Sequence, residues 1–379
     1  MRLGVIGYGL RIGQVLDELK LVDDGCRVAA ITDVRYEEIR DNWTAVQGEV
    51  PACYESPEEM LANERLDGVL IGTRCSLHTE MALKVLPTKL PLFLEKPVAT
   101  HYEDLLRLKR GFESYPSPVL VSFPLRASPL VSLVKEVLES GKIGTIEHVQ
   151  AVNNVPYGGV YFHYWYRDER ETGGLFLQKA THDFDYLNHL IGQRPVSVCA
   201  MVSKQIFKGD RPAGLKCADC EDNGSCPEST VSMTNRKLMP SEWEHCCFSE
   251  DTGNEDSGSA IIKYESGMHM SYSQNFFARR KAGSRGARLL GYKGTLEFDF
   301  YTNEVKVFMH HQPRVETYTI DPGEAHFGGD AVLAQNFIGM MKGIDQSAST
   351  LESGLTSALM CLRARESAQT HMFQDIAWS

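Results

Sequence analysis

Two short segments of the chain place basic and titratable side chains where a ligand could reach them. The first is Glu95-Lys96-Pro97, which follows an apolar run predicted to be a strand, Pro91 to Leu94. Open α/β sheets bind ligands at the carboxyl ends of their strands. Because Pro97 favours an extended conformation at the preceding residue, we expect the Lys96 ammonium to point along the floor of the crevice.

The second segment is a predicted helix from Leu175 to Ile191. Its predicted buried stripe consists of Ala180, Phe184, Leu187 and Ile191. Its adjacent polar face carries Gln178, Lys179, His182 and Asp185. Residues three and four positions apart stack on one face of a helix. A solvated helix face would explain any one of these polar residues. A lysine and a histidine one turn apart, away from the core stripe, favour a site.

The first residues of the chain predict the element that would hold a phosphate-bearing ligand next to these side chains. The apolar run Leu3 to Ile6 stops at Gly7 and Gly9, and apolar residues then recur at helical spacing. This pattern predicts a strand, a tight turn and a helix whose free N–H groups can bind a pyrophosphate. The spacing, G-x-G-x-x-x-G, is one residue longer than the commonest dinucleotide fingerprint.

A second predicted strand, Arg27 to Asp33, ends in an acid. In a dinucleotide-binding fold, a carboxylate at this position accepts hydrogen bonds from the adenosine ribose and repels a 2′-phosphate. Asp33 therefore favours NAD, and the nearby Arg35 leaves NADP as the alternative.

Strands alternate with helices up to about residue 123, which predicts a doubly wound parallel sheet. Predicted strands follow one another from residue 145 to 320, interrupted by the helix at 175–191, and helices at 330–343 and 352–370 end the pattern. We therefore predict a nucleotide-binding domain at 1–123 and an α+β domain at 124–379, with an insertion at about 208–256.

Composition excludes several classes of function. The chain has 379 residues, 42% of them hydrophobic, and a net charge of −11, which argues against nucleic acid and anionic membranes as main partners. No apolar run reaches membrane-spanning length. The start enters a glycine-broken strand directly, so we expect no signal peptide and a cytoplasmic location.

These motifs together resemble the Gfo/Idh/MocA family of oxidoreductases, over nearly the whole chain. The resemblance is carried by the glycine turn with Asp33, by Thr73-x-x-x-x-His78, by Glu95-Lys96-Pro97, and by Gly173-Gly174 leading to His182-x-x-Asp185. It implies a Rossmann domain followed by an open mixed, largely antiparallel sheet that forms a substrate cleft. It also implies hydride transfer between nicotinamide and a ring hydroxyl of a sugar, sugar derivative or cyclitol, often in dimers or tetramers.

By this resemblance, Lys96 contacts the reacting hydroxyl and the nicotinamide ribose, and His182 is the general base. A histidine that titrates near neutrality suits proton removal, and a lysine cation suits the developing alkoxide. The expected cofactor contacts are Gly7, Tyr8, Gly9, Leu10, Arg11, Ile12, Asp33, Thr73, Arg74, His78, Glu95 and Lys96. The expected substrate contacts are Arg126, Tyr161, Trp165, Gln178, Lys179, Asp183 and His326.

The chain departs from the family pattern at two places. Four residues before the histidine, the usual Asp is Gln178, which cannot exchange a proton, and Lys179 is the residue available to take part of that role. The usual Thr-Pro-Asn is Thr73-Arg74-Cys75. These changes leave two alternatives open: an NAD-dependent glycosidase that acts by transient oxidation at C3, elimination and reduction, and a non-enzymatic sugar sensor.

Half of the ten cysteines cluster in the predicted insertion, namely Cys217, Cys220, Cys226, Cys246 and Cys247. Four thiolates at such separations can close a tetrahedral zinc site that orders a loop with little core of its own. We therefore expect a structural zinc held by the first three cysteines and one of the last two. Disulfides fit a reducing compartment less well.

Overall fold

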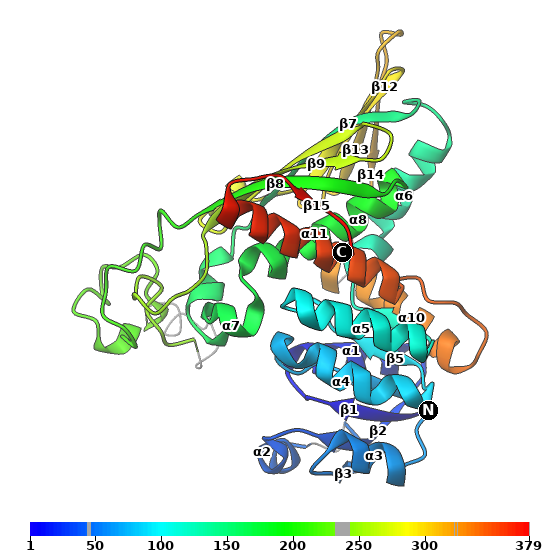
Figure 1. Ribbon diagram of the computed structural model, residues 1–379, viewed down its shortest axis with the longest axis vertical. Helices are drawn as coiled ribbons and strands as arrows, with labels where there is room; N and C mark the ends of the chain where they lie inside the picture. The colour runs from blue at the N-terminus through cyan, green and yellow to red at the C-terminus, as the bar shows by residue number, and fades with distance from the viewer. Residues whose placement is uncertain (44–46, 232–242, 322, 324, 379) are drawn as a thin grey trace.

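The computed structural model describes residues 1–43, 47–231, 243–321, 323 and 325–378. Two layers of strands lie at opposite ends of the molecule, with helices between and around them (Figure 1). The lower layer in that view is a six-stranded parallel sheet in the order β3-β2-β1-β4-β5-β6. Its strands are β1 (Arg2–Ile6), β2 (Arg27–Thr32), β3 (Ala52–Cys53), β4 (Gly68–Ile71), β5 (Leu92–Leu94) and β6 (Val119–Val121). This order is that of the Rossmann fold, so the predicted doubly wound sheet is confirmed.

Helices follow most of these strands and cover the sheet. They are α1 (Leu10–Val22), α2 (Tyr36–Asp41), α3 (Pro57–Asn63), α4 (His78–Val85) and α5 (Tyr102–Ser114). Helix α3 begins as its sequence predicts: the Ser56 hydroxyl accepts a hydrogen bond from the Glu59 amide, and Pro57 occupies the first turn. Strand β4 is buried along its whole length, because helices pack on both faces of the sheet.

A helix from the end of the chain completes this first layer. Helix α10 (Gly329–Met341) packs against α1, and its Leu333 and Phe337 share one core cluster with Leu3 and Ile12. The ring of Phe337 meets Phe93 of β5 edge-on, with 5.6 Å between centroids. The nucleotide-binding layer therefore depends on residues more than 300 positions apart in the chain.

The upper layer is a nine-stranded mixed sheet in the order β14-β13-β12-β11-β7-β10-β9-β8-β15. Only β7 and β10 pair in parallel among its described strands, so the predicted largely antiparallel sheet is confirmed. The strands are β7 (Ile146–Asn154), β8 (Pro195–Ser203), β9 (Ser257–Tyr264), β10 (His269–Asn275), β11 (Ser284–Gly291), β12 (Gly294–Asp299), β13 (Glu304–Met309), β14 (Val315–Thr319) and β15 (Gln374–Asp375).

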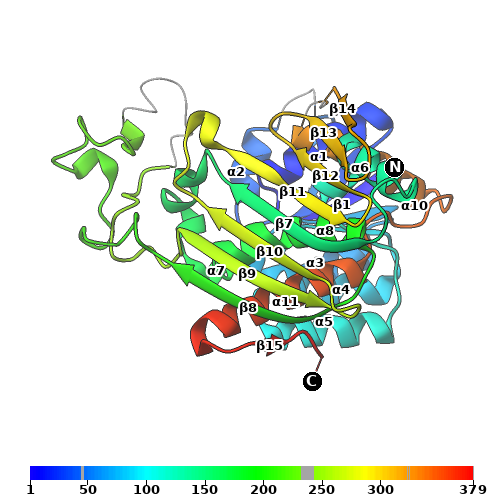
Figure 2. The same ribbon diagram turned by 90° about the horizontal axis from the view of Figure 1, so that it is seen from above.

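Helices cover the face of the upper sheet that is turned toward the first layer, and Figure 2 looks onto its other face, where the strands lie in front. The covering helices are α6 (Pro129–Glu139), α8 (Thr181–Ile191) and α11 (Leu351–Thr370), and the short α7 (Glu169–Thr172) precedes α8. The predicted helix from Leu175 begins with a π-helical turn, Phe176–Ala180, that runs directly into α8. The Glu255 carboxylate accepts the Phe176 amide at its start. This turn carries Gln178 and Lys179 into the space between the two layers.

The predicted insertion extends away from both layers as a loop region (Figure 1). Its five cysteines are all described, and none of them forms a disulfide. No three histidine, cysteine or acidic residues in the described part of the chain are arranged to hold a metal ion. The predicted zinc site is therefore not supported. The spacing of the cysteines was compatible with zinc, but three of the expected ligands, Cys217, Cys246 and Cys247, are buried thiols in the loop packing.

Among the described residues, the helices include none that is long and apolar enough to span a membrane.

Candidate active site

The glycine turn forms as the sequence predicts, at the carboxyl end of β1. Gly7 has φ = +81°, and a Cβ there would lie 2.7 Å from the backbone nitrogen of Thr73, so no other residue fits without strain. A Cβ on Gly9 would meet nothing within 4 Å, and no side chain caps the N-terminus of α1. The turn therefore leaves an open cradle in front of a helix N-terminus, which fits the pyrophosphate of a dinucleotide.

Asp33 lies beside this cradle at the end of β2. Its carboxylate accepts hydrogen bonds from the backbone amides of Tyr8, at 2.7 Å, and Arg35, at 2.8 Å. The Arg35 guanidinium turns back to the carbonyl oxygen of Tyr8, at 3.0 Å. The acid is thus fixed next to the glycine turn, where the ribose of a dinucleotide would lie.

Several expected cofactor contacts have other partners in the structure. The Arg11 guanidinium is directed away from the cradle and binds Glu95, at 2.9 Å, and Asp330, at 2.7 Å. His78 is buried, and its ring nitrogens lie 2.8 Å and 3.2 Å from the carbonyl oxygens of Pro97 and Thr73. These two side chains hold the surrounding loops.

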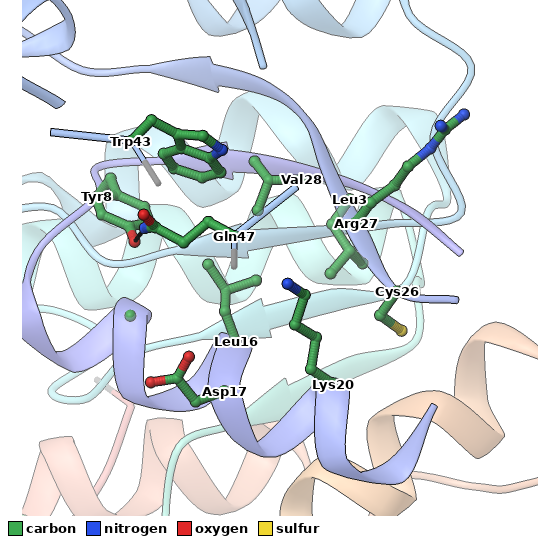
Figure 3. Close-up of a pocket in the computed structure, with 11 residues that line it drawn as sticks. Leu3, Tyr8, Leu16, Asp17, Lys20, Cys26, Arg27, Val28, Trp43 and Gln47 are labelled. Carbon is green, nitrogen blue, oxygen red and sulfur yellow. Dashed lines mark hydrogen bonds between the residues drawn. The ribbon is translucent and has the colours of Figure 1, made fainter. Parts of the chain in front are cut away.

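A pocket lies next to α1 (Figure 3). The Tyr8 ring packs on Trp43 with 5.6 Å between centroids, and the Gln47 amide donates to the Tyr8 hydroxyl at 2.9 Å. The lining comes from β1, β2, α1 and the segment that holds Trp43 and Gln47. Lys96 and His182 are not among its residues, so this pocket is not where the two predicted catalytic side chains meet.

Those two side chains converge in the space between the layers. The Lys96 ammonium donates to the backbone carbonyl of Gln178 at 3.1 Å, which ties the carboxyl end of β5 to the π-helical turn before α8. His182 follows one turn later, with its ring edge-on to Phe123 at 5.8 Å between centroids. Its Nδ1 atom is buried and has no hydrogen-bond partner among the described residues. An unpartnered buried ring nitrogen is a group poised to bind a ligand hydroxyl.

Electrostatics sets the protonation of both groups. Burial, and then the charge of the neighbouring Lys179 ammonium, lower the pKa of Lys96 to about 7. Burial, and then the charges of Lys96 and Arg285, hold the pKa of His182 well below its usual value. At neutral pH the imidazole is therefore uncharged, and Lys96 is the group whose proton is exchangeable.

Lys179 lies in the same cleft under two tyrosines. Its ammonium is 3.3 Å from the Tyr157 hydroxyl and 4.6 Å from the centre of the Tyr161 ring. Next to it, the Gln178 amide oxygen faces the thiol of Cys75 at 3.9 Å. Trp165 lies at the outer side, where the Arg74 guanidinium stacks on its ring at 3.9 Å. Of the expected substrate contacts, Lys179 and Tyr161 lie against each other, and Gln178 is next to Lys179 in the chain.

Two other expected substrate contacts are engaged inside the protein. Arg126 pairs with both oxygens of Asp185, at 2.9 Å and 2.7 Å, and also donates to the carbonyl of Ala348. Asp183 is fully buried and accepts hydrogen bonds from Asn153, Tyr272 and Arg285. Their side chains are therefore not available to a ligand. On α8, Asp183 faces the strands of the upper sheet, and Asp185 faces Arg126 in the segment before α6.

Two residues of the cleft were missed from the sequence, Tyr157 and Arg285. Arg285 lies on β11, more than 100 residues after His182, and its charge lowers the pKa of His182. Only the pairing of β11 with β7 brings it under α8, where it bonds Asp183 at 2.8 Å. No local signal in the sequence marks either residue.

His326 closes one side of the cleft. Its Nδ1 lies 2.7 Å from Asp330, and both His326 and Phe327 adopt left-handed backbone conformations with φ of 48° and 57°. The positive charge of a protonated His326 would act with those of the lysines and Arg285 to lower the pKa of His182. Non-glycine residues in this conformation are held there by surrounding contacts, here by the Asp330–Arg11 pair.

Comparison with known proteins agrees with this architecture. The curated relatives include the putative oxidoreductase YteT of Bacillus subtilis, 27% identical over an alignment of length 322 that covers 74% of each chain. They also include a myo-inositol 2-dehydrogenase of Thermotoga maritima, 29% identical over 213 residues, which are 55% of this chain and 61% of that protein.

Solved structures share the whole fold. A levoglucosan dehydrogenase in complex with NADH and levoglucosan superposes with a TM-score of 0.76 over 99% of both chains, at 18% identity. An oxidoreductase domain protein of Kribbella flavida gives a TM-score of 0.79 over 99% of this chain and 98% of its own, at 15% identity.

Two family descriptions cover most of the chain. Residues 1–123 match "Oxidoreductase family, NAD-binding Rossmann fold", and residues 131–297 match "GFO/IDH/MocA C-terminal domain". The chain is thus a member of the Gfo/Idh/MocA family of oxidoreductases, with an NAD-binding Rossmann domain.

Proposed function

We propose that the protein oxidises a ring hydroxyl of a sugar, sugar derivative or cyclitol, with NAD as the hydride acceptor. The observation that carries the proposal is that Lys96 is bonded to the Gln178 carbonyl one helical turn before His182, close enough for its charge to act on the His182 ring. When bound, NAD supplies the oxidising power, and the chain must supply a place for the hydroxyl proton. The inositol and levoglucosan dehydrogenases among the relatives support a polyhydroxylated ring as substrate.

We assign Lys96 and His182 proton-transfer roles that differ from those implied by the family resemblance. A general base is most efficient when its pKa lies near the working pH, and this describes Lys96 better than His182. We therefore assign Lys96 as the group that accepts the hydroxyl proton. The neutral His182 ring accepts a hydrogen bond from the substrate and fixes the hydroxyl in front of Lys96.

The test is a panel of free sugars, cyclitols and glycosides incubated with the protein and NAD. We expect net formation of NADH, followed by absorbance, with at least one free ring polyol. Release of an aglycone without net NADH would instead support the glycosidase. Binding of panel members with neither reaction would support a sensor and contradict the proposal.

The choice between NAD and NADP is expected to depend on Asp33. In Asp33→Ser, the ratio of kcat/KM for NADP to that for NAD should rise at least about tenfold, because the carboxylate that repels a 2′-phosphate is gone and Arg35 remains. The ratio is measured with the same alcohol substrate for both cofactors. Asp24→Ser, a change at an exposed turn, is the control and should leave the ratio unaltered. An unchanged ratio in Asp33→Ser would contradict the role given to this acid.

A further inference from the structure

The cleft holds more positive than negative charge. Lys96, Lys179 and Arg285 all lie close enough to the His182 ring to lower its pKa. Two buried carboxylates act on these cations, and each is already paired with an arginine. Asp183 binds Arg285 at 2.8 Å, and Glu95 binds Arg11 at 2.9 Å. Among the described residues, neither lysine therefore has a carboxylate partner of its own.

Lys179 is a buried basic residue without an acidic partner among the described residues. Its side chain is 7% exposed, and no carboxylate of the described residues lies within 4.0 Å of its ammonium. Its neighbours are the Tyr157 hydroxyl and the faces of Tyr157 and Tyr161. Burial lowers the pKa of Lys179, which means that its charge is held at a cost. An anion next to it would offset that cost.

The residues around Lys179 do not supply this anion. Gln178, next to Lys179, is neutral and turns its amide toward Cys75. Asp183, the buried acid whose charge acts on Lys179, is paired with Arg285, and Glu255 accepts the amide of Phe176 at the start of the π-helical turn. Tyr157 is 48% exposed, so a ligand that enters past it would reach the Lys179 ammonium next to the reaction centre.

We propose that the substrate carries a carboxylate, and that Lys179 and the Tyr157 hydroxyl bind it while Lys96 and His182 face the hydroxyl to be oxidised. This rests on the proposed function and names its substrate class: sugar acids or cyclitol acids. A single ammonium with one phenol donor matches a monoanion. A phosphate monoester, with two charges, would require further donors that the described residues do not place there.

The experiment compares hexoses with the hexuronic acids that differ from them only at C6, with NAD. We expect at least one acid to be turned over with kcat/KM at least about tenfold above that of its neutral partner, because a charge-assisted hydrogen bond to a buried cation is gained. In Lys179→Met the acid-to-neutral ratio should collapse toward one, mainly through KM for the acid. Lys263→Met, at an exposed position of β9, makes the same charge change and should keep the ratio.

Binding is measured beside turnover, as the shift in unfolding temperature that each acid produces with NADH present. Binding of an acid that is lost in Lys179→Met, with no hydride transfer to any compound, would support the anion subsite and contradict the proposed reaction. Equal turnover of neutral and acidic partners would support the reaction and overturn the subsite. Preference for a sugar phosphate over the matched uronic acid would also overturn the carboxylate assignment. If no compound is bound or turned over, both the anion subsite and the proposed reaction are contradicted.

Discussion

Replacing Lys96 with methionine is expected to lower kcat by about a thousandfold or more while the protein still binds NAD. Removal of a general acid–base group costs about 10²–10⁴ in rate, and Lys96 is also the side chain that ties β5 to the π-helical turn. Turnover is followed by NADH formation with the best substrate of the panel, and NAD binding by titration of the protein's fluorescence. Turnover within about tenfold of the unaltered protein would contradict the assignment.

This loss can be separated from misfolding, because the same change should stabilise the protein. Lys96 has a pKa of about 7 when folded, against about 10.4 for a free lysine, so the unfolded chain binds more protons between these values. Its charged form is thus disfavoured in the folded state, and stability attributable to Lys96 rises as the pH rises through this window. Lys96→Met should raise the melting temperature at pH 7. A variant that is both inactive and less stable would leave the loss attributable to folding and would contradict this account.

The pH profile gives a second readout of the same side chain. With Lys96 as the proton acceptor, kcat/KM for oxidation should rise as the pH rises through about 7, because the ammonium must first lose its proton. Lys96→Arg, whose guanidinium stays charged, should be inactive across this range. A profile that falls through pH 7 would show instead that the charged lysine is needed, as the family resemblance implies.

His182→Asn should also lower kcat, by about 10²-fold, since it removes the hydrogen bond that fixes the hydroxyl. Its matched control is His189→Asn, on the same helix. The His189 ring lies 3.2 Å from the Lys135 ammonium, outside the cleft, and this change should keep activity.

Much of the fold could be predicted from the sequence, because the spacing of apolar residues within short segments indicates the strands and helices. The alternation of strands and helices predicts the parallel sheet, and the run of strands after residue 145 predicts the largely antiparallel one. The packing of α10 on α1 could not be predicted in this way, since Leu333 and Ile12 become neighbours only when the chain folds back. Spacing alone also made the five clustered cysteines look like zinc ligands.

The candidate site shows the same division between local and distant information. Lys96, Lys179 and His182 are found from motifs on single elements, and the structure brings them together. Their protonation depends on burial and on Arg285, which comes from a distant strand. Asp183 was expected at the substrate because helical spacing gives no indication that Asn153, Tyr272 and Arg285 converge on it.

A buried ion network joins the glycine turn to the end of the chain. The Arg11 guanidinium binds both oxygens of Asp330, at 2.8 Å and 2.7 Å, one oxygen of Glu95 at 2.9 Å, and the Ser122 hydroxyl at 3.1 Å. These partners follow β5 and β6 and begin α10. Asp330 also meets His326 at 2.7 Å. One side chain thus fastens the loops on both sides of the cleft.

Replacing Arg11 with methionine is therefore expected to lower the free energy of unfolding by about 3–5 kcal/mol, since it leaves the carboxylates of Glu95 and Asp330 buried without their counter-ion. Chemical unfolding followed by circular dichroism measures the loss. Arg107→Met, which breaks an exposed ion pair with Asp104 on α5, is the matched control and should change stability by no more than about 1 kcal/mol. Equal effects of the two changes would contradict a structural role for the network.

The pH dependence of stability should change with the same substitution. Burial alone would raise the pKa of Asp330, but hydrogen bonds from His326 and Arg11 outweigh it and lower this pKa to about 2. A carboxylate with a lowered pKa contributes stability that is present above about pH 4 and is lost as the pH falls toward 2. In Arg11→Met the pKa of Asp330 should rise, so the variant should lose its remaining stability at a higher pH than the unaltered protein. Parallel acid-unfolding curves for the two proteins would instead mean that Asp330 is held ionised by His326 alone.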